Sequence, residues 1–177
     1  MRKRHLIILI FFSILPGCKK TETTRTSGTD TIENTVYQNS QSYYAFGFSF
    51  SKAKKISNLL NPGPDITLVV NNENTVSRLT LQTNNLDPSF YKVGDYQDET
   101  SAISAFKSLK TVNASSWQDM ADPVNANQVW IYKSGDGYYT KLRIASIINE
   151  IRNSLPYGEC TFEWVYQPDG SKTFPGK

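Results

Sequence analysis

The sequence predicts a mostly β fold in which antiparallel sheets and hairpins accompany one short helix, and three observations support this class. Large apolar residues recur at every second position along several segments, which is the spacing of a half-buried strand. A Gly135-Asp136-Gly137 turn separates two apolar runs, which is typical of a hairpin. One clear helical stripe of apolar side chains is found, within residues 98–110.

Three strands are expected in the first half of the domain. Residues 43–50 alternate aromatic and small side chains, and they predict a half-buried strand. Residues 65–70 and 75–82 predict a hairpin around a polar turn. The segment 52–60 fits either a strand or a short helix, and a turn rich in proline and glycine follows it at 61–64.

The middle of the chain is expected to hold two loops and the helix. Residues 84–95 and 113–128 are polar and irregular, and they predict loops. Between them, Asp98 is placed to cap the N-terminus of a helix over 98–110.

The second half is predicted to be β structure. Residues 129–132 and 138–148 flank the glycine turn and form the expected hairpin. A final strand is expected over 160–166, with one face formed by Cys160, Phe162, Trp164 and Tyr166.

The N-terminus has the features of a bacterial lipoprotein signal. Arg2, Lys3 and Arg4 precede an apolar run over 6–15, and Leu15-Pro16-Gly17-Cys18 resembles a lipobox. In such signals the chain is cut just before the cysteine, and the thiol receives a diacylglycerol. The apolar run is too short for a transmembrane helix, which needs about 20 residues. We therefore expect Cys18 to be lipidated and the lipid alone to hold the mature chain at a membrane.

The sequence divides into three expected regions: a signal peptide over 1–17, a flexible tether over 18–42 and a single β-rich domain over 43–177. The tether is rich in Thr, Ser, Asn and Gln, and its only large apolar residues are Ile32, Val36 and Tyr37. So few apolar side chains cannot form a core of their own.

Composition argues against several classes of function. The only histidine, His5, lies in the signal peptide, so the usual general base and most zinc sites are excluded from the mature chain. Arg2, Lys3 and Arg4 account for the whole excess of 19 basic over 16 acidic residues, and a neutral mature chain is not expected to bind nucleic acid. We expect a protein that is not an enzyme, with a carboxylate-based hydrolase as a distant alternative.

Two stretches carry a family resemblance. Residues 130–142 (WIYKSGDGYYTKL) and 161–171 (TFEWVYQPDGS) resemble the C-terminal half of the HmuY-type lipoproteins of Bacteroidetes. Residues 47–50 with 65–66 look like the first sheet of that family, and the similarity covers roughly 43–174. The resemblance implies a haemophore-like β fold, an outer-membrane lipoprotein with acyl chains such as palmitate, and capture of haem or another hydrophobic ligand.

The chain departs from that family at the haem ligands. Family members hold haem through axial histidine or methionine side chains, whereas Met120 is the only methionine that follows the signal and no histidine does. The family's ligand residues therefore cannot be carried over, and the cofactor is unknown, with haem the one that the resemblance suggests. The candidate ligand-binding residues are Met120, Trp117, Tyr138 and Tyr139; alternatively, Met120 fills a gap under its loop and the aromatic residues only pack.

Two other groups have a structural and a functional interpretation. Asp95, Asp98 and Glu99 form the densest carboxylate cluster, which fits a helix start better than a calcium loop. Cys160 has no partner for an internal disulfide, and it is either a buried apolar residue or a reactive thiol. No metal site is expected.

The leading hypothesis is a cell-envelope binding protein anchored by lipid on Cys18, which takes a small hydrophobic ligand. The alternative is a structural or interaction lipoprotein that serves an envelope protein as an accessory subunit at the outer membrane.

Overall fold

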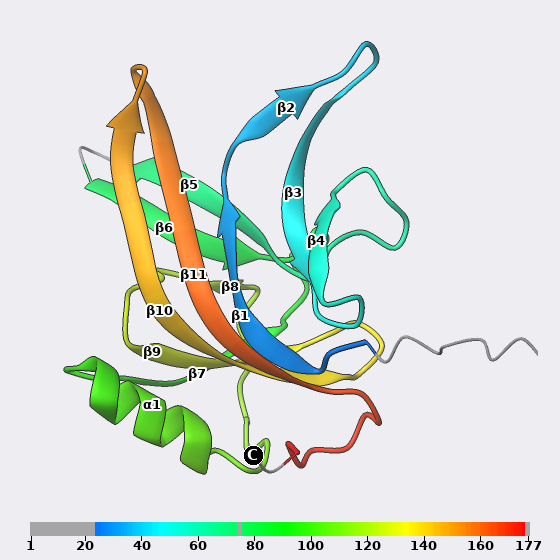
Figure 1. Cartoon of the computed structure of the whole chain (residues 1–177), viewed down its shortest axis with the longest axis vertical. Helices are drawn as coiled ribbons and strands as arrows, with labels where there is room; N and C mark the ends of the chain where they lie inside the picture. The colour runs from blue at the N-terminus through cyan, green and yellow to red at the C-terminus, as the bar shows by residue number, and fades with distance from the viewer. Residues whose placement is uncertain (1–23, 74–75, 176–177) are drawn as a thin grey trace, which may run out of the picture.

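The structure, a computed structural model, describes residues 24–73 and 76–175 and is rich in β structure with one short helix (Figure 1). The predicted fold class is therefore confirmed. The elements in chain order are β1 (Ser27–Glu33), β2 (Val36–Gln38), β3 (Tyr43–Ser49), β4 (Lys54–Ser57), β5 (Thr67–Glu73), β6 (Val76–Gln82), β7 (Phe90–Asp95), α1 (Glu99–Ser108), β8 (Met120–Ala121), β9 (Gln128–Lys133), β10 (Tyr139–Arg152) and β11 (Leu155–Gln167).

The strands of the described residues form three antiparallel sheets. The largest has the order β1-β11-β10-β9-β7, and two three-stranded sheets have the orders β2-β3-β4 and β5-β6-β8. The two small sheets are linked where Phe48 pairs with Ile66. The main core lies between the large sheet and the two small ones.

Strand alternation decides which side chains enter this core. Phe162 and Trp164 of β11 and Leu142 of β10 point inward, and their neighbours in sequence point to the opposite face. The ring of Phe48 on β3 meets Phe162 at 5.5 Å and Trp164 at 5.4 Å between centroids. Burying each such side chain contributes about 1.5–3 kcal/mol, so these contacts hold the small sheets against the large one.

Helix α1 covers the outer face of the large sheet, where Phe106 packs against Val129 and Val165. Asp98 accepts a hydrogen bond from the Ser101 N–H at 2.7 Å, which confirms the predicted cap. At the other end, the buried Lys141 Nζ donates to the carbonyl oxygens of Phe106 and Leu109 at 2.8 and 3.0 Å. A cation there stabilises the helix C-terminus.

The predicted tether is wrong over 27–38, where the structure has β1 and β2. Strand β1 pairs with β11 along its whole length, from Ser27 opposite Val165 to Glu33 opposite Glu159, and Ile32 is completely buried. The strand is polar and lies at the edge of its sheet, where backbone hydrogen bonds hold it more than apolar side chains do. Its partner β11 lies some 130 residues further along the sequence, so local patterns did not reveal it. Cys18 and the predicted signal lie outside the described residues.

Both predicted loops also contain strands. β7 lies within 84–95 and is recruited by β9, with a register shift between Lys92 and Gly94 that breaks the alternation. β8 lies within 113–128, and β4 resolves the ambiguous segment at 52–60 as a strand.

The last two strands are longer than predicted, because the chain between them forms one hairpin with β10 and β11. Asn153 and Ser154 make its turn with positive φ angles of 50° and 63°. The hairpin extends beyond the core as an arm (Figure 1).

Candidate functional site

A groove lies between the two small sheets, where β3 and β5 diverge. We call it the β5 groove. Its volume is about 480 Å³, and its lining residues are Asn34, Val36, Ala45, Asn58, Thr67, Leu68, Val69, Val70, Gln82 and Asn84. Its lining combines apolar side chains from β2, β3 and β5 with the amide side chains of Asn34, Asn58, Gln82 and Asn84.

Backbone pairing explains why the groove exists. Phe48 and Ile66 exchange N–H···O bonds of 2.9 and 3.2 Å, and beyond this point no ladder joins β3 to β5. Gly47 permits the close junction, since a Cβ there would lie 2.3 Å from the Ile66 carbonyl oxygen. The N–H and C=O groups of Ile66 point toward β3. Backbone groups of every second residue in a strand point to the same side, so those of Leu68 and Val70 also point toward β3 and into the groove.

Exposed apolar side chains gather on the two hairpins that rise beyond the core on this side of the molecule (Figure 1). Val36 and Tyr43 on the β2–β3 hairpin are 63% and 69% exposed, and Ile151 and Leu155 on the β10–β11 hairpin are 65% and 68% exposed. Ile151 pairs with Pro156 and Leu155 with Arg152, so these two side chains point to opposite faces of their hairpin.

The two hairpins, which we call the arms, meet at the groove through Asn34. This lining residue donates from its N–H to the Gly158 carbonyl oxygen at 3.1 Å, and its side chain accepts from the Gly158 N–H at 2.8 Å. Gly158 lies against Val70 of β5. The end of β1 and the base of the β10–β11 arm therefore adjoin the groove.

The predicted ligand residues do not form one cluster. Met120 on β8 lies directly opposite Gln82, which lines the β5 groove, so the two side chains share a face of their sheet. Trp117 packs against Tyr139, with 6.2 Å between ring centroids, on the outer face of the large sheet. Tyr138 contacts Tyr166 at 6.1 Å instead, away from that pair.

The carboxylates near the helix have structural partners. Asp98 caps α1, and its bonds to Ser101 lower the pKa of the carboxyl. Glu99 lies 3.6 Å from the guanidinium of Arg143, and Asp95 accepts a hydrogen bond from Gln128 at 2.6 Å. Among the residues that the structure describes, no three His, Cys, Asp or Glu side chains lie close enough to hold a metal ion.

Cys160 is a free, fully buried cysteine of the main core, as its apolar interpretation predicts. Burial raises the pKa of its thiol to about 12, so the thiol stays protonated at neutral pH and is a poor nucleophile.

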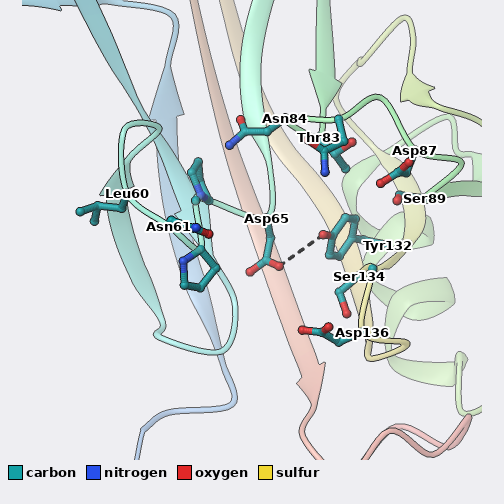
Figure 2. A pocket seen from close by; sticks show the side chains of 15 residues that line it. Leu60, Asn61, Asp65, Thr83, Asn84, Asp87, Ser89, Tyr132, Ser134 and Asp136 are labelled. Atoms are coloured by element: carbon teal, nitrogen blue, oxygen red, sulfur yellow. Dashed lines mark hydrogen bonds between the residues drawn. The ribbon is translucent and has the colours of Figure 1, made fainter. Parts of the chain in front are cut away.

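A second, polar cavity lies between the 58–64 loop, the 83–89 loop and the β9–β10 turn (Figure 2). We call it the Asp65 pocket. It has a volume of about 390 Å³, and side chains that border it include those of Asn61, Asp65, Thr83, Asn84, Asp87, Ser89, Tyr132, Ser134 and Asp136. The sequence analysis missed this site, although a carboxylate placed between Pro64 and a buried strand was a signal for it.

Asp65 is held in a fixed orientation within this pocket. One carboxylate oxygen accepts from the Phe50 N–H at 2.7 Å, and the other accepts from the Tyr132 hydroxyl at 3.3 Å (Figure 2). Burial raises the pKa of Asp65, and these hydrogen bonds oppose the rise. Burial, followed by the charge of Asp65, also raises the pKa of Tyr132, which therefore remains a hydroxyl donor.

No protein-family model matches the chain, and no curated protein matches it in sequence. Within the described residues, α1 is not long and apolar enough to cross a membrane.

Proposed function

We propose that this protein is a lipid-anchored binding protein of the cell envelope that captures a hydrophobic ligand in the β5 groove. The observation that carries the proposal is a groove of about 480 Å³ with aliphatic side chains in its lining, beside two arms that bear exposed apolar residues. The lipobox-like sequence at Leu15–Cys18 supports the anchoring, and the outer membrane follows from the family resemblance.

The groove suits an apolar ligand with a polar edge. Val36 from β2 and the half-buried Val69 and Val70 from β5 offer apolar contact, and each 100 Å² of apolar surface removed from water contributes about 2.5 kcal/mol. The amide side chains of Asn58 and Gln82 offer hydrogen bonds to polar groups of a ligand. A volume near 480 Å³ is within the usual range for small-ligand sites.

Haem is the ligand to test first, and its mode of binding would differ from that of bis-histidine proteins. Met120 is the one thioether that follows the signal, and its side chain shares a sheet face with the groove residue Gln82. We therefore expect weak haem binding, with porphyrin contacts in the groove and at most one methionine ligand.

The test is a titration of residues 24–177 with haem and with metal-free protoporphyrin IX, followed by absorption and tryptophan fluorescence. Val36→Asp should weaken binding of both compounds at least tenfold, because it places a charge in the groove. Leu86→Asp is the matched control, since Leu86 is 50% exposed and does not line the groove. Met120→Leu should change only the haem Soret band. Binding of neither compound, or equal effects of the two aspartate variants, would overturn the proposal.

The open edge of β5 favours a second candidate, an accessory subunit that pairs with an envelope protein. β5 is the outer strand of its sheet, and the backbone groups of Leu68 and Val70 face the groove, where an extended segment of a partner could bond to them. This role predicts that Val36→Cys cross-links to a distinct envelope protein in intact cells, whereas the porphyrin titrations show no binding.

A further inference from the structure

The Asp65 pocket is a second cavity with its own chemistry. Its lining shares only Asn84 with the lining of the β5 groove. Whereas the groove lining has several aliphatic side chains and no charged one, the pocket is lined mostly by carboxylate, amide and hydroxyl groups. It therefore suits a different kind of ligand.

The charge of the pocket is one-sided. Asp65, Asp87 and Asp136 line it, and none of its lining residues is Lys, Arg or His. Asp65 is partly buried within the pocket, and Asp87 and Asp136 are exposed where they border it. Lys52 acts on Asp65 through its charge but lies outside the lining. A cavity whose own lining carries only carboxylate charges favours a cationic occupant.

An unpaired buried hydroxyl points to a missing partner. Thr83 is only 8% exposed and borders the pocket, and its Oγ1 has no hydrogen-bond partner in the structure. Buried polar groups are almost always hydrogen-bonded, and leaving one unpaired costs about 1–3 kcal/mol. A ligand with its own polar groups would supply this partner.

The site is also preorganised. Asp65 is held by Phe50 and Tyr132, and the Asn84 amide lies so close to Gly63 that a Cβ there would be 2.4 Å from its Nδ2. Fixed polar groups bind a ligand at a smaller entropy cost than mobile ones. The three carboxylates are too dispersed to share one metal ion, and the volume of about 390 Å³ accommodates an organic molecule.

We propose that the Asp65 pocket binds a small hydroxylated amine, of the size of an amino sugar. Its ammonium group pairs with the carboxylates of Asp65 and Asp136, which border the same pocket, Asp65 beside Tyr132 and Asp136 below it in the view of Figure 2. Its hydroxyl groups bond to the Asn84 amide and to Thr83 Oγ1.

The test compares D-glucosamine with D-glucose, its neutral counterpart, by calorimetric titration of the full chain purified in detergent near neutral pH. Glucosamine should bind saturably, and glucose at least tenfold more weakly. Asp136→Asn should weaken glucosamine binding at least tenfold without lowering the melting temperature. Asp119→Asn is the matched control, because Asp119 is an exposed aspartate outside the pocket and its replacement should have no effect.

Two further comparisons make the outcome decisive. Thr83→Val removes the hydroxyl while keeping its shape, and it should weaken glucosamine binding while leaving the binding of putrescine, an amine without hydroxyls, unchanged. Val36→Asp should leave glucosamine binding intact, which separates this pocket from the β5 groove. Equal binding of glucose and glucosamine, or no effect of Asp136→Asn, would refute the proposal.

Discussion

At the scale of single residues, burial gives the polar groups of this protein their properties. Asp65 and Tyr132 are held together inside the polar pocket, and burial raises the pKa of each. Burial likewise makes Cys160 an apolar core residue rather than a nucleophile. The pKa of the exposed Asp98 is lowered instead, because hydrogen bonds from Ser101 stabilise its charged form.

The raised pKa of Asp65 predicts a specific pH dependence of stability. The folded state binds the Asp65 proton more tightly than the unfolded state does, whose aspartate titrates near pH 4. The contribution of this group to the free energy of unfolding therefore falls as the pH rises from about 4 through the folded-state pKa. Asn at this position does not titrate, so the wild type should gain stability relative to Asp65→Asn as the pH is lowered from 7 to 4.

Urea unfolding of both proteins at several pH values measures this difference directly. If the free energies of unfolding of the two proteins change in parallel between pH 7 and 4, the pKa of Asp65 is not raised in the folded protein and the prediction is contradicted.

At the scale of elements, the large sheet depends on a strand that comes from the polar N-terminal region. β1 lies at its edge beside β11, and its buried Ile32 reaches the same core cluster as Phe48 and Trp164. β1 is also continuous with β2, which forms one arm beside the β5 groove. This region is therefore part of the domain and of its candidate site.

Replacing Ile32 by alanine should lower the free energy of unfolding by about 2–5 kcal/mol, because it leaves a cavity in a packed core. Ile151→Ala is the control: Ile151 is 65% exposed on the β10–β11 arm, and its loss should change stability by less than about 0.5 kcal/mol. Chemical denaturation compares the two variants. Equal, small effects would mean that β1 contributes little to the fold.

At the scale of the whole molecule, the fold divides into a packed body and two arms. The body is the core between the three sheets, with α1 on the outer face of the large sheet. The arms carry exposed apolar residues, and the Asp65 pocket lies between loops on the body. A lipid on Cys18 would hold both candidate sites near a membrane surface.

Lipidation of Cys18 predicts that the wild type is recovered with the membranes and carries a diacylglycerol on its N-terminal cysteine. Cys18→Ala should retain the uncut leader, because the lipid acceptor is lost. Cys160→Ala should remain anchored, since Cys160 is buried in the core. Membrane fractionation and intact-mass spectrometry provide the measurement, and an unmodified N-terminus at another residue contradicts the prediction.

Much of the fold could be predicted from local patterns. The alternation at 43–50, the hairpin at the Gly135 turn and the capped helix after Asp98 were all visible, and β3, β9, β10 and α1 confirm them. β1 and β7 could not be predicted in the same way. Each is an edge strand of the large sheet, and pairing with β11 or β9 defines it more than its own side chains do.

The sequence by itself determined the β-rich class, the single helix of the described residues, the absence of histidine after His5 and the lipobox-like motif that predicts the anchor. The tertiary structure alone decided where binding sites could form. It separated Trp117 and Tyr139 from Met120, opened a groove where β3 leaves β5, and enclosed Asp65, Tyr132 and Asp136 in one pocket. The physical reason is that local propensity acts over a few neighbouring residues, whereas these sites are made by pairing and packing between segments that lie tens of residues apart.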